Sequence, residues 1–260
     1  MKFNYHSPTK VKEALDLAST NSAYLAGGMT TIPSMKLGLA SYKDIINVKN
    51  IDKLSGIKVS AKSVTIGAAT SHADVANSKD VKKAIPALAK LAGGIGDPQV
   101  RNRGTIGGSI ANNDPSACYP SACMALNAII HTSERKIEAS KFFKGMFETA
   151  LKKGELIEAV EFSIPEKSQY QKHPNPASRY AIVGVFVAKY KDHANVAVTG
   201  AKSSVYIDKD LSKALSDNFS GSAVDSVNVD GSEMNSDIHA SADYRASLVK
   251  THTRKAVENC

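Results

Sequence analysis

Short apolar runs alternate with helical patterns over the first 165 residues. After Ser7-Pro8, which is typical of a helix cap followed by proline in the first turn, apolar residues recur at helical spacing over residues 11–18. Residues 81–92 predict another helix, with Pro86 near a first turn or at a kink. Five short apolar runs are typical of β-strands: residues 23–26, 44–48, 63–68, 127–131 and 156–164.

A polar, proline-containing connection is predicted from Pro165 to Pro176. Beyond it the pattern changes to two β-rich runs and two helical patterns, at residues 180–190, 195–207, 209–219 and 241–257. We therefore predict an α+β unit over residues 1–165 and a smaller unit over residues 176–260, in which helices flank two sheets.

The composition is that of an ordinary globular protein, because 42% of its 260 residues are hydrophobic and 22% are charged. No stretch approaches the roughly 20 apolar residues of a membrane span, and the first residues lack the apolar run of a secretory signal. We therefore expect a cytoplasmic protein. The net charge is +8, but the lysines are spread along the chain and no nucleic-acid motif is present, so no nucleic-acid partner is expected.

The residues that commonly carry catalysis or bind metals form no recognisable set. Cys118, Cys123 and Cys260 are too few for a disulfide framework or for the usual four ligands of an iron–sulfur cluster, and we expect free thiols. His72 is better explained as a residue that caps or packs a helix start than as a catalytic base. No histidine lies in a group with metal-ligand spacing. We expect neither a metal ligand nor a catalytic residue.

Two glycine-rich segments are the strongest candidates for a binding site. Residues 25–33 follow a buried strand, and residues 104–115 contain Gly107 and Gly108; in each, a double glycine precedes a helical stretch. Backbone N–H groups converge on a phosphate only where no Cβ blocks the approach, so two such loops could hold the two phosphates of a dinucleotide. A tight connection without a ligand is the alternative for each loop. The sequence contains neither a Rossmann fingerprint nor a Gly-Lys-Ser/Thr phosphate loop.

Four segments, in order, resemble the FAD-binding subunits of molybdenum hydroxylases, the group that contains carbon monoxide dehydrogenase and xanthine dehydrogenase. These segments are Ala26–Pro33, Asp97–Ser109, Tyr180–Val185 and Ser241–Arg245. The part from Arg101 to Ser109 is the most specific, and the resemblance covers essentially the whole chain. It implies an α+β fold, in which a two-part FAD-binding domain of the vanillyl-alcohol-oxidase (PCMH) type precedes a small C-terminal α+β domain.

The resemblance also implies which residues contact the flavin. Around the pyrophosphate and ribityl chain it places Leu25, Ala26, Gly27, Gly28, Met29, Thr30, Thr31, Ile32, Thr105, Ile106, Gly107, Gly108 and Ser109. Further implied contacts are Gly96, Val100, Asn112, Asp114, Ile157, Lys172 and Tyr180. Lys172 would face the flavin, and Tyr180 would shield one face of its ring. Cys118 stands where relatives commonly carry an aspartate, a contact that Asp114 could replace. Met29 stands where carbon monoxide dehydrogenases tend to have histidine, which argues against carbon monoxide as the substrate.

The implied function is that of an electron-transfer subunit. A large partner with a molybdenum cofactor would oxidise the substrate, and a small partner with two [2Fe–2S] clusters would pass the electrons on. This chain would hold FAD non-covalently, because the loops carry no histidine near the ring, and would deliver the electrons to an external acceptor. The whole would be a dimer of heterotrimers. A free-standing flavin oxidoreductase with its own substrate pocket and a nucleotide-binding module without a redox role are the alternatives.

Overall fold

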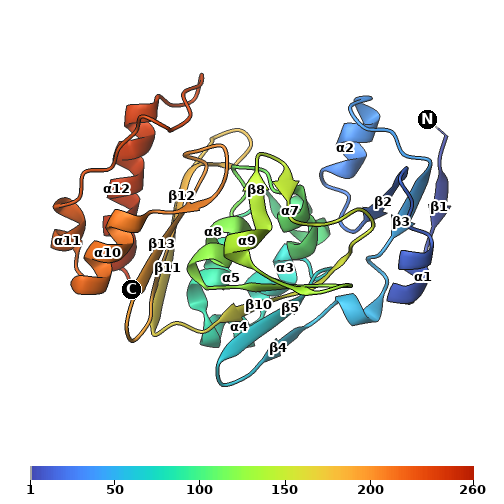
Figure 1. Ribbon diagram of the computed structural model, residues 1–260, viewed down its shortest axis with the longest axis horizontal. Helices are drawn as coiled ribbons and strands as arrows, with labels where there is room; N and C mark the ends of the chain where they lie inside the picture. The colour runs from blue at the N-terminus through green and yellow to red at the C-terminus, as the bar shows by residue number, and fades with distance from the viewer. Residues whose placement is uncertain (1) are drawn as a thin grey trace.

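The computed structural model describes residues 2–260, and Figure 1 shows three parts in a row along the longest axis. The N-terminal part is a parallel sheet in the order β1-β3-β2. Its elements are β1 (Asn4–His6), α1 (Val11–Asp16), β2 (Ser22–Leu25), α2 (Thr31–Lys36) and β3 (Asp44–Asn47). The helix predicted after Ser7 begins at Val11, because the backbone is still extended at Lys10, and the Glu13 carboxylate accepts the N–H of Thr9 just ahead of the helix at 3.1 Å.

The central part is an antiparallel sheet in the order β4-β5-β10-β6-β7, covered by helices. Its strands are β4 (Ile57–Val59), β5 (Ser63–Gly67), β6 (Ile129–Thr132), β7 (Lys136–Glu138) and β10 (Ile157–Ser163), with the hairpin β8 (Phe143–Gly145) and β9 (Glu148–Thr149) beside them. Its helices are η1 (Asp52–Leu54), α3 (His72–Asn77), α4 (Lys79–Ala84), α5 (Pro86–Gly93), α6 (Pro98–Arg103), α7 (Ile106–Asn112), α8 (Tyr119–Ala125) and α9 (Ala139–Phe142). The helical pattern over residues 81–92 is divided at Pro86, since proline fits a first turn but not a helix interior.

The C-terminal part corrects two predictions. Its four strands form one antiparallel sheet, not two: β11 (Lys167–Pro174), β12 (Ala181–Lys189), β13 (Ala194–Thr199) and β14 (Tyr206–Ile207). Strand β11 occupies the predicted polar connection. It is an edge strand in which Tyr170 is the single fully buried residue, so its sequence has no apolar run. The run predicted over residues 195–207 breaks at Gly200, which has a left-handed φ of 83°. Helices α10 (Lys209–Asp217), α11 (Gly221–Asp225) and α12 (Ala242–Glu258) complete this part.

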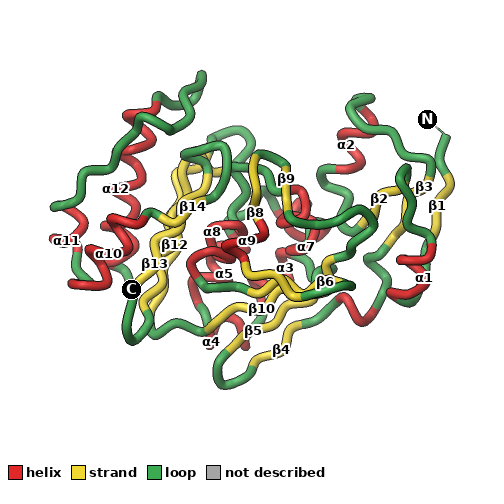
Figure 2. The backbone as a smooth tube through the Cα atoms, in the orientation of Figure 1, coloured by secondary structure: helices red, strands yellow, loops and turns green. Residues whose placement is uncertain are grey.

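The C-terminal sheet is buried on both faces and therefore joins the last two parts. Figure 2 shows it between α10 and α12 on one side and α5 and α8 on the other. Phe186 and Ala188 of β12 pack into the central core, whereas Val185 and Val187 pack into the outer core. Because successive side chains of a strand point to opposite faces, β12 is apolar throughout. The segment around residues 170–180 is thereby held against the central helices.

Candidate functional site

A cleft of about 480 Å³ lies where the N-terminal part meets the central part. The predicted contact residues that line it are Ala26, Gly27, Gly28, Met29, Thr30, Thr31, Gly96, Val100, Thr105, Gly107, Gly108, Ser109, Asn112, Asp114, Cys118, Ile157 and Tyr180. The other predicted contacts, Leu25, Ile32, Ile106 and Lys172, lie outside the lining. Both glycine loops therefore face one cavity, which is the arrangement that a dinucleotide site requires.

The two glycine loops pack directly against each other. A Cβ on Gly27 would overlap the backbone carbonyl of Arg103, which lies just before the second loop. A Cβ on Gly107 would lie 2.5 Å from the Cβ of Ala68 at the end of β5. Both glycines are therefore required by contacts within the protein. The alternative of a tight structural connection, which the sequence left open for each loop, thus applies to these two glycines beside their predicted role at a ligand.

The loops differ in how many backbone donors they leave free. In the second loop, the N–H of Gly107 donates to a carbonyl at the end of β5 at 2.9 Å, and that of Gly108 to the hydroxyl that caps its own helix at 3.2 Å. In the first loop, the N–H groups of Gly28, Met29 and Thr30 meet no acceptor among residues 2–260. These residues are partly or fully exposed at the cleft, so a ligand or water can reach their N–H groups. The first loop is therefore the one that offers N–H groups to an anionic ligand.

Asp114, Cys118 and Tyr180 meet in another part of the cleft wall. Arg179 has a left-handed φ of 61°, and this turn presents Tyr180 at the cleft, where 45% of the residue is exposed. Burial, and then the neighbouring Asp114 and Cys118, raise the pKa of Tyr180. Burial also raises the pKa of Asp114, although a hydrogen bond from the N–H of Ser116 opposes the shift. The tyrosine ring is thus placed where it can cover a planar ligand.

Lys172 is held behind this wall and does not face the cleft. Its Nζ donates to the carbonyl of Gly94 at 2.6 Å, to the carbonyl of Arg179 at 3.0 Å and to the sulfur of Cys118 at 3.6 Å. An ammonium group has three donors, so all of them are used within the protein. In this arrangement Lys172 fixes the wall of the cleft.

Several lining residues carry no motif and escaped the sequence interpretation: Tyr24, Ala68, Ala69, Ile95, Leu151, Glu155 and Leu156. His72 also lines the cleft, and its predicted packing role is confirmed. It is 4% exposed, its ring centroid lies 5.4 Å from that of Tyr119, and Ser71 caps the helix. Burial, with smaller effects of Lys49 and Arg101, lowers the pKa of His72 to about 4. The imidazole is therefore neutral at neutral pH.

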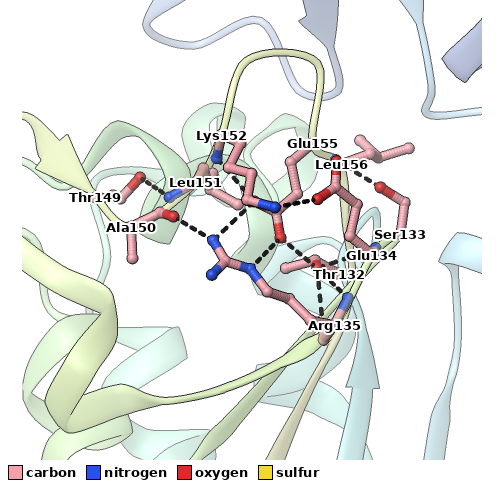
Figure 3. A network of polar contacts seen from close by, with 10 residues as sticks. All are labelled: Thr132, Ser133, Glu134, Arg135, Thr149, Ala150, Leu151, Lys152, Glu155 and Leu156. Carbon is pink, nitrogen blue, oxygen red and sulfur yellow. Dashed lines mark hydrogen bonds and ion pairs between the residues drawn. The ribbon is translucent and has the colours of Figure 1, made fainter.

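An ion pair between the partly exposed Arg135 and the buried Glu155 anchors the part of the wall before β10 (Figure 3). The Glu155 carboxylate, with 0% of its side chain exposed, accepts from Arg135 Nε at 3.0 Å, Thr132 Oγ1 at 2.6 Å and the N–H of Lys152 at 2.7 Å. Burial raises the pKa of Glu155, but the hydrogen bonds and the Arg135 charge outweigh it and lower the value to about 2. Arg135 also donates to a carbonyl of the same loop at 2.7 Å. Residues 150–156 are thereby fixed at the cleft.

Within residues 2–260, no three His, Cys, Asp or Glu side chains are grouped so that they could hold a metal ion. No helix in this range is long and apolar enough to cross a membrane. The three cysteines are free thiols, which confirms the prediction from their number.

Comparisons with known proteins agree with this site. Residues 1–166 match the family described as the FAD binding domain in molybdopterin dehydrogenase. The glyceraldehyde dehydrogenase medium chain of Sulfolobus acidocaldarius is 34% identical, over 98% of this chain and 97% of that protein. The carbon monoxide dehydrogenase medium chain of Hydrogenophaga pseudoflava is 31% identical, over 98% of this chain and 96% of that protein. A chain of reconstituted carbon monoxide dehydrogenase from Oligotropha carboxidovorans has a TM-score of 0.91 and 27% identity, over 99% of this chain and 97% of that chain.

The chain therefore belongs to the family of FAD-binding domains of molybdopterin dehydrogenases. Several relatives that it matches over nearly the whole length are named as medium chains or medium subunits. The resemblance inferred from four sequence segments is confirmed, and so is the α+β fold class. A free-standing oxidoreductase and a module without redox function are not supported by these relatives.

Proposed function

We propose that this chain is the FAD-carrying medium subunit of a cytoplasmic molybdenum hydroxylase. The observation that carries the proposal is that both glycine loops line one cleft in a chain of this family. When bound, FAD supplies the redox chemistry, and the protein supplies binding and orientation. No residue of this chain has to touch the substrate, so the substrate is set by the large partner.

The residues of the cleft suit the parts of FAD. We assign the pyrophosphate to the free N–H groups of Gly28, Met29 and Thr30 in the first loop. We assign Ile157 to an apolar contact with the flavin and Tyr180 to one face of its ring. The predicted contact residues of the second loop would pack against the first loop and complete the wall of the cleft. The FAD-binding domain would span residues 1–165, and the C-terminal domain would begin with β11 rather than at residue 176.

The electron route and the assembly follow from the same assignment. Electrons from a molybdenum-containing large subunit would pass through two [2Fe–2S] clusters of a small subunit and the cofactor of this chain to an external acceptor. We propose a dimer of heterotrimers as the complete enzyme. The relatives named as medium chains or subunits support the existence of partners.

The isolated chain is expected to hold flavin that dithionite reduces but that carbon monoxide, purines, aldehydes and N-heterocycles leave oxidised. Addition of the small and large partners should restore bleaching by one of these substrates. Anaerobic absorbance at about 450 nm, where oxidised flavins absorb, measures flavin reduction before and after the partners are added. Bleaching of the isolated chain by an organic substrate would contradict the subunit assignment and favour a free-standing oxidoreductase.

FAD is expected to be bound without a covalent link. Histidyl attachment needs a histidine close to the ring, and the only histidine of the cleft lining, among residues 2–260, is the buried His72. Acid precipitation of the flavin-loaded chain should therefore release all the yellow colour into the supernatant. Colour that remains in the washed pellet would show a covalent bond.

Cys118→Asp is expected to bind FAD as well as the natural chain or better. The carboxylate would lie beside the Lys172 ammonium, which is 3.6 Å from the present sulfur, and a charge-assisted hydrogen bond would replace a weak one. The dissociation constant of FAD, measured by flavin fluorescence, tests this expectation. Loss of flavin from a folded Cys118→Asp chain would mean that this wall differs from that of the relatives with aspartate.

A further inference from the structure

A thiol in the cleft wall lies next to an amine behind that wall. Cys118 precedes α8 in the central part, lines the cleft and is 5% exposed. Lys172 lies in β11 of the C-terminal part, and its Nζ is 3.6 Å from the sulfur. The carbonyls of Gly94 and Arg179 hold the amine in this place through bonds of 2.6 and 3.0 Å. The two reactive atoms therefore remain adjacent across the boundary between two parts of the fold.

The side chain of Tyr170 supplies an independent observation at the same place. It is 4% exposed, and its hydroxyl meets no hydrogen-bond partner among residues 2–260 other than the neighbouring thiol of Cys118, which is a weak one. Burial, and then the neighbouring Cys118, raise the pKa of Tyr170 well above its usual range. A buried hydroxyl normally has a partner. An oxygen atom placed between the sulfur of Cys118 and the nitrogen of Lys172 would give this hydroxyl a stronger partner than the thiol.

We propose that Cys118 and Lys172 form an oxidative modification site, at which hydrogen peroxide inserts one oxygen atom between Sγ and Nζ. Peroxide first oxidises the thiol to a sulfenic acid and is reduced to water. A second peroxide removes the other two electrons as the oxygen–nitrogen bond forms. In total, the thiol, the ammonium and two peroxides give one S–O–N bridge, three waters and one proton. The bridge is a covalent link between β11 and the start of α8, and it does not depend on a bound cofactor.

The geometry makes Cys118 the only cysteine of residues 2–260 that is suited to this reaction. The thiol is reached through the cleft that it lines, and a thiol needs both access and a nearby cation to react readily. Cys123 is 0% exposed inside the central core, and burial raises the pKa of its thiol far above the usual range. Burial raises the pKa of Cys260 to about 11, against a smaller opposing effect of Lys167, and within the described chain no lysine makes a hydrogen bond with its sulfur.

The test treats the purified full-length chain with hydrogen peroxide and follows the intact mass and the peptide map. The expected product is heavier by one oxygen and lighter by two hydrogens. The peptides that contain Cys118 and Lys172 should be recovered as one linked species, which dithiothreitol separates again. Cys260→Ser serves as the matched control and should give the same linked product.

Cys118→Ser and Lys172→Arg should each abolish the linked species, while circular dichroism shows that both variants are folded. In Lys172→Arg, Cys118 should instead proceed to the sulfinic acid, because no amine captures the first oxidation product. A linked species that persists in Lys172→Arg would overturn the proposal. So would oxidation of Cys118 to the sulfinic acid in the natural chain with Lys172 unmodified.

Discussion

Gly27→Ala is expected to weaken FAD binding by at least about tenfold, a loss of about 1.4 kcal/mol or more. The added Cβ would overlap the carbonyl of Arg103, and a backbone atom cannot rotate away as the end of a side chain can. The two glycine loops would have to separate, which displaces the free N–H groups of residues 28–30 from the pyrophosphate. Gly107→Ala is expected to act in the same way through Ala68. The flavin-to-protein ratio after purification and a flavin titration of the apoprotein measure both variants.

Gly93→Ala is the matched control for these variants. The same atom is added to the same chain, but its nearest neighbour would be the Cβ of Ala76 at 3.7 Å, an ordinary contact. Flavin affinity and melting temperature should therefore remain at their natural values or rise slightly. If folded Gly27→Ala retained flavin at full stoichiometry, the contact between the loops would not be what shapes the site.

Arg135→Met is expected to lower the melting temperature by about 10 °C at neutral pH, because it leaves a buried carboxylate without its partner. Glu155 has a fully buried side chain, and Arg135 ties it to the loop over residues 150–156. That loop forms part of the cleft wall, so flavin affinity should fall together with stability. Lys141→Met is the control: its ion pair with Glu138 is exposed on both sides, and its removal should change little.

The pH dependence separates this electrostatic effect from a simple loss of packing. The pKa of Glu155 in the folded chain, about 2, lies below its ordinary value of 4.5. Its contribution to stability is therefore complete above pH 4.5 and is lost as the pH falls through about 2. In Arg135→Met, the Arg135 charge no longer opposes the effect of burial, so the pKa of Glu155 rises. Glu155 then becomes protonated at mildly acidic pH, and the variant no longer buries an unpaired negative charge. The difference in melting temperature should shrink from pH 7 to pH 4, and a constant difference would contradict the electrostatic explanation.

Local sequence patterns determined much of the fold. The apolar runs at residues 44–48 and 63–68 form β3 and β5, and the helical patterns over residues 209–219 and 241–257 form α10 and α12. These elements bury a face of their own, and burial imposes a period on the sequence. Strand β11 was not predicted, because it buries almost none of its side chains. It is an edge strand with one fully buried residue, and backbone hydrogen bonds to β12 hold it in place. Backbone pairing does not require apolar residues at alternate positions, so the sequence of β11 shows no strand pattern.

The candidate site divides in the same way. Both glycine loops and the family could be identified from the sequence, because a double glycine and its flanking residues form a local pattern. Three features could not be predicted: the contact of Gly27 with Arg103, the anchor of Glu155 on Arg135 and the turn of Lys172 toward Cys118. Each joins positions that are distant along the chain; Lys172 and Cys118, for example, are 54 residues apart. Only the packing of the three parts brings such atoms together, so the tertiary structure alone decided which donors are free and which glycines are structural.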